Sequence, residues 1–281
     1  MPYTTLISAT TLNENLNNPK WIIIDARFSL ANYDSGRYAY RHGHIPTARY
    51  AHLNDDLSAT ITDLTGRHPL PDLTTLAQKL GAWGICNDSQ VVVYDDASGA
   101  FAARLWWLLR RVGHNNVAVL DGGIQHWQKH GYELTTQLPS VQATTFRIYS
   151  QPDLCLSATQ VQNHLAQKTI KLLDARTPER YRGDNEPIDP VAGHIPGALN
   201  RAFQLNIDFT GLFLPTESLR SQFKTLIGNT PAEHVVHYCG SGVTACHNLL
   251  AMESAGLLGS KLYAGSWSEW IRDKNRGIAR G

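Results

Sequence analysis

The sequence has few of the features that mark specialised classes of protein. Its formal net charge is +1, and it contains no long run of basic residues. Neither nucleic acid nor an anionic membrane is therefore expected as a partner. No apolar run approaches the length of about 18 residues that a membrane span requires, and the first residues lack the charged and apolar regions of a signal peptide. We therefore expect a cytoplasmic protein that does not bind membranes.

Cysteine is also scarce, with four in 281 residues. Four cysteines are too few for a disulfide framework in a chain of this length, and none has the C-x-x-C spacing of structural zinc sites or redox pairs. The glycine-containing turns match neither the dinucleotide nor the Walker pattern. We therefore expect no cofactor and no bound metal. The sequence assigns no role to Cys86, Cys155 or Cys246.

An internal repeat is the main feature that the sequence does contain. Four landmarks occur in the same order in both halves, about 143 to 150 residues apart. The paired segments are 21–27 and 170–176, 44–46 and 194–196, 91–95 and 235–239, and 122–127 and 265–270. Conserved order and spacing indicate a tandem duplication, and the length suits about two domains.

Each copy alternates short apolar runs with stretches of helical periodicity. In the first copy, we expect strands at 22–25, 91–94 and 117–120, and helices at 74–80 and 100–112. This alternation predicts an α/β fold in which each domain has a parallel sheet flanked by helices on both faces.

A polar, proline-containing stretch without strong periodicity separates the two copies. It is typical of a linker that crosses one domain surface to reach the next. The predicted boundaries are an N-terminal domain at 1–138, a linker at 139–152 and a C-terminal domain at 153–281.

The most informative stretch, residues 237–245, reads His-Tyr-Cys-Gly-Ser-Gly-Val-Thr-Ala. Cys239 ends an apolar strand, at a turn that contains Gly240 and Gly242, and a run compatible with a helix follows. Main-chain N–H groups and the helix dipole converge at such a turn and stabilise the nucleophilic thiolate. An isolated cysteine is more often an inert core residue, but this setting favours a reactive one.

The first copy has Asp95 where the second has Cys239. Aspartate cannot act as a soft nucleophile, so the duplication kept the scaffold in both halves and the chemistry in one. We therefore predict that the N-terminal domain is non-catalytic.

Together these motifs resemble those of tandem-domain rhodanese-type sulfurtransferases. The resemblance rests on the loop at 238–245, on the paired Asp-Ala-Arg and Gly-His-Ile-Pro elements, and on Asp-Gly-Gly at 121–123, and it covers nearly the whole chain. It implies two tandem rhodanese-like domains and an enzyme that moves a sulfane sulfur from a small donor to cyanide or a thiol, through a persulfide on Cys239. A thioredoxin-like reductant is one acceptor of this kind.

The resemblance also implies roles for individual side chains and amides. The residues expected to surround the thiolate or persulfide are Gly240, Ser241, Gly242, Val243 and Thr244. We expect the Ser241 hydroxyl to contact the anion or the donor, and the Thr244 hydroxyl to cap the helix that follows. Arg180 is the expected donor-binding residue, since a guanidinium pairs with both oxygens of a carboxylate; Arg182 is a second candidate.

Two compounds, 3-mercaptopyruvate and thiosulfate, remain candidates for the preferred sulfur donor. The loop is similar to that of 3-mercaptopyruvate sulfurtransferases, whereas thiosulfate-preferring relatives more often have basic residues directly after the cysteine. Mercaptopyruvate-type enzymes also carry a further arginine just after a Glu-Pro, but here Glu186-Pro187 is followed by Ile188-Asp189. The uncharged loop narrowly favours 3-mercaptopyruvate over the thiosulfate dianion.

His44 of the N-terminal domain is a candidate partner for the serine of the loop. In mercaptopyruvate-type relatives, a histidine and an aspartate of that domain reach the loop serine. His44 matches by motif, and Asp34 or Asp63 could orient it as an acid–base partner. His194 occupies the same place in the second copy, which favours instead a structural role common to both.

Two other classes of function also place a cysteine at the end of a strand. A cysteine-based phosphatase shares the strand–loop–helix plan but needs an arginine six residues after the cysteine, where this chain has Ala245. A non-enzymatic protein would use Cys239 as a passive sulfur carrier and the first domain as a binding module. Steady-state turnover with small donors distinguishes a catalyst from a carrier.

Overall fold

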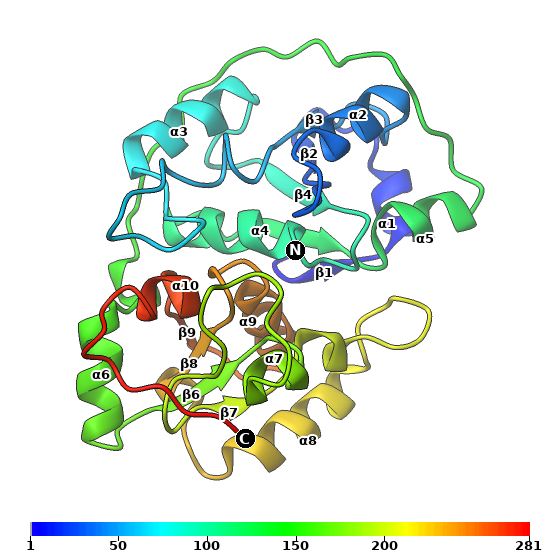
Figure 1. Cartoon of the computed structure of the whole chain (residues 1–281). Coiled ribbons are helices and arrows are strands. Elements are labelled where there is room, and N and C mark those ends of the chain that lie inside the picture. Colours follow the sequence, from blue (N-terminus) through cyan, green and yellow to red (C-terminus); the bar gives the residue numbers. More distant parts are fainter. Residues whose placement is uncertain (1) are drawn as a thin grey trace. The chain divides into compact units, whose positions relative to one another are not determined.

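The computed structural model describes residues 2–281 and divides them into two compact units (Figure 1). Unit 1 comprises residues 2–59, 70–151 and 209–213, and unit 2 comprises residues 60–69, 152–208 and 214–281. The main division falls between 151 and 152, at the end of the expected linker. Two short segments, 60–69 and 209–213, pack with the unit opposite to that of their neighbours in sequence. The repeat pattern of the sequence does not predict this exchange.

Unit 1 is built around a parallel five-stranded sheet of order β1-β5-β4-β2-β3. Its strands are β1 (Leu6–Ile7), β2 (Trp21–Asp25), β3 (Arg49–Tyr50), β4 (Gln90–Tyr94) and β5 (Val117–Leu120). Its helices are α1 (Ala9–Glu14), α2 (Ser35–His42), α3 (Leu73–Ala82), α4 (Ala102–Arg111) and α5 (Gly123–Lys129).

Unit 2 repeats this plan with a parallel four-stranded sheet of order β7-β6-β8-β9. Its strands are β6 (Lys171–Asp174), β7 (Leu199–Asn200), β8 (Val235–Tyr238) and β9 (Lys261–Leu262). Its helices are α6 (Ala158–Ala166), α7 (Pro178–Arg182), α8 (Thr216–Ile227), α9 (Ala245–Ser254) and α10 (Ser266–Trp270). Short 3-10 helices lie at Pro152–Leu154, Phe203–Asn206 and Ala232–His234.

The sheet of each unit is buried on both faces, as the continuous apolar runs predict. On one face of the unit 1 sheet, Ile23 and Val92 pack with Leu12 of α1 and Trp127 of α5; α4 packs against β4 and β5. In unit 2, α6 and α10 contribute to the core on one face, and α9 packs against β8 and β9. The predicted α/β fold, with two tandem parallel-sheet domains, is confirmed.

The aspartates at the strand ends fix the same turn in both units. Arg27 N donates to Asp25 at 3.0 Å, and the Arg27 guanidinium spans the Asp25 carboxylate and the carbonyl oxygen of Gly43. Arg176 makes the equivalent contacts with Asp174 and with the carbonyl oxygen of Gly193. Such fully satisfied buried pairs hold the strand ends in place, so both copies present the following loops from the same scaffold.

No helix among residues 2–281 is both long and apolar enough to cross a membrane.

Candidate active site

Cys239 lies where β8 passes into a short loop that leads to α9. Its side chain is buried, with 2% of the residue exposed. Gly242 has a φ of 76°, a left-handed conformation that suits glycine. This bend turns the main chain back toward the cysteine, so that Gly242 N donates to Cys239 Sγ at 3.2 Å.

The environment of Cys239 favours its thiolate. Burial raises the pKa of a thiol, but here hydrogen bonds from the Thr244 hydroxyl and from the main-chain N–H groups of Ser241, Ala245 and Gly242 outweigh it and lower the pKa of Cys239 below its usual value. These donors stabilise the charged form of the sulfur and not the neutral form. The loop is therefore a preorganised site for a sulfur anion.

Thr244 does not cap α9 as the sequence suggested. It precedes the helix, but its side chain makes no capping hydrogen bond. The residue already has helical dihedral angles, with φ −70° and ψ −14°, whereas a capping residue is typically extended. Its hydroxyl instead interacts with the Cys239 sulfur.

Residues at the start of α10 form hydrogen bonds with the main chain of the loop. Cys239 N donates to Ser266 Oγ at 3.1 Å. Trp267 N and Ser268 N donate to the carbonyl oxygens of Cys239 and Gly240 at 3.0 and 2.9 Å. Because these carbonyl groups are engaged, the loop amides remain directed toward the sulfur.

The segment at 60–69, which packs in unit 2, brings two residues to the loop. His68 Nδ1 lies 2.7 Å from Ser241 Oγ. Arg67 forms an ion pair with Asp189, and its main-chain N donates to Ser268 Oγ at 3.1 Å. Neither residue was among the candidates predicted from the sequence. The available signal was an adjacent Arg-His pair in an irregular segment, the kind of setting in which functional residues concentrate.

His68 therefore makes the contact with Ser241 for which His44 was the candidate in the sequence. His44 is fully buried in unit 1. Its ring nitrogens lie 2.7 Å from the carbonyl oxygen of Tyr40 and 3.2 Å from that of Gln137. His194 lies in the same way against the carbonyl oxygen of Tyr181. These contacts agree with the structural role that the shared position of the two histidines favours, and not with a relay through His44.

Arg180 extends from α7 to the loop. Its Nε lies 3.0 Å from both carboxylate oxygens of Glu186, and its Nη2 lies 3.1 Å from Asp189 Oδ2. A Cβ atom built on Gly240 would lie 3.3 Å from Arg180 Nη2, so the guanidinium is next to the residue that follows Cys239.

Arg182, the second arginine candidate, is not brought to the loop. Its Nε pairs with Asp184 at 2.7 Å, and both side chains are largely exposed. Residues two apart on a helix differ in direction by about 200°, so α7 presents only one of the two arginines to Cys239.

The other cysteines have different surroundings. Cys246 is buried on α9, and its Sγ donates to the carbonyl oxygen of Gly242 at 3.4 Å, so it supports the loop. Cys86 and Cys155 are partly buried. Among residues 2–281, the histidine, cysteine and carboxylate side chains form no cluster able to hold a metal ion.

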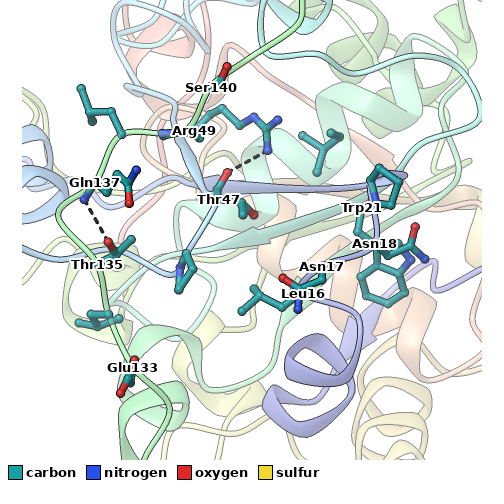
Figure 2. Close-up of a pocket in the computed structure, with 16 residues that line it drawn as sticks. Leu16, Asn17, Asn18, Trp21, Thr47, Arg49, Glu133, Thr135, Gln137 and Ser140 are labelled. Atoms are coloured by element: carbon teal, nitrogen blue, oxygen red, sulfur yellow. Dashed lines mark hydrogen bonds between the residues drawn. The ribbon is translucent and has the colours of Figure 1, made fainter.

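A large cavity of unit 1 offers none of this chemistry. It has a volume of about 640 Å³ and is lined by the residues that connect α1 to β2, by 46–49 and by 133–140. Figure 2 shows its side chains, with Arg49 bonded to the carbonyl oxygen of Thr47 and Gln137 N bonded to Thr135 Oγ1. Its lining contains no cysteine or histidine. The loop of unit 2 is therefore the candidate active site.

Comparison with known proteins gives a consistent result for both halves. The family model of the rhodanese-like domain matches residues 8–130 and again residues 157–273. These segments correspond to the two copies of the internal repeat.

Two relatives match over nearly the full length. A protein of Pseudomonas aeruginosa named "Probable 3-mercaptopyruvate sulfurtransferase" is 48% identical over 98% of this chain and 98% of its own. The thiosulfate sulfurtransferase of Rattus norvegicus is 31% identical, over 96% of this chain and 93% of its own.

Solved structures show the same architecture. The structure of SseA from Escherichia coli, described as a 3-mercaptopyruvate sulfotransferase, has a TM-score of 0.83 and 30% identity, covering 95% of this chain and all of that one. The 3-mercaptopyruvate sulfurtransferase from Leishmania major has a TM-score of 0.84 and 28% identity, covering 95% of this chain and 74% of that one.

Proposed function

The chain belongs to the rhodanese-like family, and on that premise we propose that it is a sulfurtransferase in which Cys239 carries the transferred sulfur as a persulfide. The observation that supports this most directly is the loop of hydrogen-bond donors around Cys239, in which Gly242 N donates to Sγ at 3.2 Å and the donors lower the pKa of the thiol. Hydrogen bonds to the sulfur raise the fraction of thiolate, which is the nucleophilic form of cysteine.

In the first half-reaction the Cys239 thiolate attacks the sulfur of the donor. With 3-mercaptopyruvate, an S–S bond forms as the C–S bond breaks, and the electron pair of that bond passes to the enolate of pyruvate. The thiol proton of the donor leaves the transferred sulfur, which balances the proton that the enolate gains at carbon. With thiosulfate, the electron pair leaves on sulfite. In both cases the negative charge on Cys239 moves outward to the terminal sulfur of the persulfide, where loop amides can stabilise it.

In the second half-reaction a nucleophilic acceptor removes the terminal sulfur. Cyanide attacks it to give thiocyanate, and the electron pair of the S–S bond returns to Cys239 as thiolate. A thiol acceptor gives a new persulfide in the same way. The chain thus acts on a small-molecule donor and a small acceptor, and we include a thioredoxin-like reductant among its acceptors. Such chemistry suits a reducing compartment such as the cytoplasm.

We assign the hydrogen-bonded His68–Ser241 pair to the leaving group of 3-mercaptopyruvate. The enolate must gain a proton at carbon to become pyruvate, whereas sulfite requires none. A histidine 2.7 Å from the Ser241 hydroxyl can deliver a proton through that hydroxyl as a general acid. This assignment predicts that the pair matters more for one donor than for the other.

3-Mercaptopyruvate is the donor that the site favours, with thiosulfate next. The loop from Gly240 to Thr244 contains no cationic side chain, so it does little to attract a dianion. The guanidinium of Arg180 lies beside Gly240 and suits a single carboxylate. The relatives include proteins named for each donor.

Mass spectrometry tests the proposal. Incubation with 3-mercaptopyruvate, without acceptor, should add about 32 Da to the peptide that contains Cys239, and added cyanide should remove it and release thiocyanate. Cys239→Ser should show no addition and no turnover. An unmodified Cys239 peptide, while the wild-type protein consumes the donor, would contradict the proposal.

A further inference from the structure

Two guanidinium groups converge beside the nucleophile in unit 2. A Cβ atom built on Gly240 would lie 2.8 Å from Arg67 Nη2 and 3.3 and 3.5 Å from the Nη atoms of Arg180. The space that a side chain would take at position 240 is therefore occupied by two cations. The positive charge that the loop's own side chains lack is supplied by the segment at 60–69 and by α7.

Asp189 joins these two guanidinium groups. One of its carboxylate oxygens pairs with Arg67 and the other lies 3.1 Å from Arg180 Nη2. The Asp189 side chain is 2% exposed, whereas those of Arg67 and Arg180 are 25% and 16% exposed. The carboxylate is thus buried behind guanidinium groups that remain open toward solvent.

The charges around the loop balance closely. Arg180 also pairs with Glu186, which lies 3.1 Å from Arg176, and Arg176 pairs in turn with Asp174. The cations of this cluster are Arg67, Arg176 and Arg180, and the anions are Asp174, Glu186 and Asp189. Because their charges cancel, the cluster has no positive excess with which to offset a dianion next to the Cys239 thiolate.

We propose that Arg67 and Arg180 together bind the carboxylate of the donor, and that Asp189 sets the charge of this pair so that a monoanionic α-keto acid is preferred to the thiosulfate dianion. The inference rests on the proposed sulfurtransferase function and identifies what determines the donor. Arg67 supplies a second guanidinium although no arginine follows Glu186-Pro187. The planar guanidinium groups of both arginines can donate hydrogen bonds to the same carboxylate.

Kinetics with the two donors test this inference. Arg67→Gln should raise KM for 3-mercaptopyruvate about tenfold, with a smaller effect on kcat, because a ground-state contact is lost. Arg67→Lys keeps the charge without the fork and should lie between Arg67→Gln and wild type. Asp189→Asn should raise the ratio of kcat/KM for thiosulfate to that for 3-mercaptopyruvate by about tenfold, because it gives the balanced cluster of three arginines and three carboxylates a net positive charge.

Arg182→Gln is the matched control, because it removes an arginine from the same region whose partner is the exposed Asp184. Arg182→Gln should leave kcat and KM unchanged for both sulfur donors. Thermal melting of each variant reports folding, and if Arg67→Gln does not fold, Arg67→Lys and Asp189→Asn decide the question. An unchanged KM in both Arg67 variants, or an Asp189→Asn effect equal for the two donors, overturns the inference.

The result also separates this inference from the function on which it rests. If the wild-type protein forms no persulfide on Cys239 with either donor, the proposed function fails. If the persulfide forms and the variants leave the donor ratio unchanged, only the inference fails.

Discussion

The loops after β4 and β8 show how one scaffold supports two different outcomes. In unit 1 the carboxylate of Asp95 is fully buried and accepts hydrogen bonds of 2.8 to 2.9 Å from four main-chain N–H groups. These groups belong to Ala97, Gly99, Phe101 and Ala102. In unit 2 the equivalent position holds Cys239, whose sulfur is surrounded by amides and the Thr244 hydroxyl.

Both loops are therefore binding sites for an anion. In unit 1 the anion is a carboxylate that belongs to the chain and fills the site permanently. In unit 2 it is a sulfur whose charge can move outward onto a transferred atom. The loop geometry thus stabilises negative charge in both units, while the residue at the strand end decides whether that charge can take part in a reaction.

The largest expected effect comes from making the second loop like the first. Cys239→Asp should place a carboxylate among the same donors, so sulfur transfer should fall to background while the fold is retained. Thiocyanate production and thermal melting measure the two properties. Cys86→Ser, which alters a partly buried cysteine of unit 1, should keep full activity. Residual turnover by Cys239→Asp would show that another residue carries the sulfur.

A second prediction distinguishes His68, which contacts Ser241, from His44, which the sequence motif suggested for that contact. Ser241→Ala and His68→Gln should each lower kcat for 3-mercaptopyruvate by about 10²-fold, because a general acid is lost. Their effect on thiosulfate turnover should be much smaller, since sulfite leaves without a proton. His44→Gln should change the stability of unit 1 but not the donor ratio. Equal losses with both donors would refute the role of the pair in proton transfer.

A third prediction concerns the Thr244 hydroxyl, which in unit 2 donates a hydrogen bond to the Cys239 sulfur in addition to the main-chain amides. Thr244→Val removes a hydroxyl that lowers the pKa of Cys239. The pKa should therefore rise, less thiolate should be present at neutral pH, and alkylation by iodoacetamide should slow by about tenfold at pH 7. The rate of alkylation measured against pH should follow a curve displaced to higher pH. A curve that coincides with that of the wild type would show that the amides alone stabilise the thiolate.

The scaffold was predictable because its signals are local and occur twice. The apolar strand runs and the Asp-Ala-Arg turns specify the same contacts in each copy, down to the pairing of Asp25 with Arg27 and of Asp174 with Arg176. The position of Cys239 between a strand and a helix was likewise predicted. Each of these inferences needed only neighbouring residues and the comparison of two halves.

The supporting residues of the site were not predictable in the same way. The contact between His68 and Ser241 joins residues 173 apart in sequence, and the segment at 60–69 has no periodicity that would place it in unit 2. The repeat also drew attention to His44, because motifs shared by both copies are the easiest to find. Residues that serve chemistry in one copy only, such as Arg67, have no counterpart to reveal them.

The smallest expected effect on activity comes from emptying the loop of unit 1. Asp95→Ala leaves four main-chain N–H groups, two of them buried and two partly buried, without their acceptor, and urea unfolding should show a loss of about 3 kcal/mol. Asp96→Asn, at the exposed neighbouring position, should cost far less. The kcat of folded Asp95→Ala protein should match that of the wild type, because no atom of this loop is needed to carry sulfur. A loss of kcat without a loss of stability would mean that the carboxylate in unit 1 contributes to the reaction. Both loops would then be needed for sulfur transfer, although only the loop of unit 2 carries the sulfur.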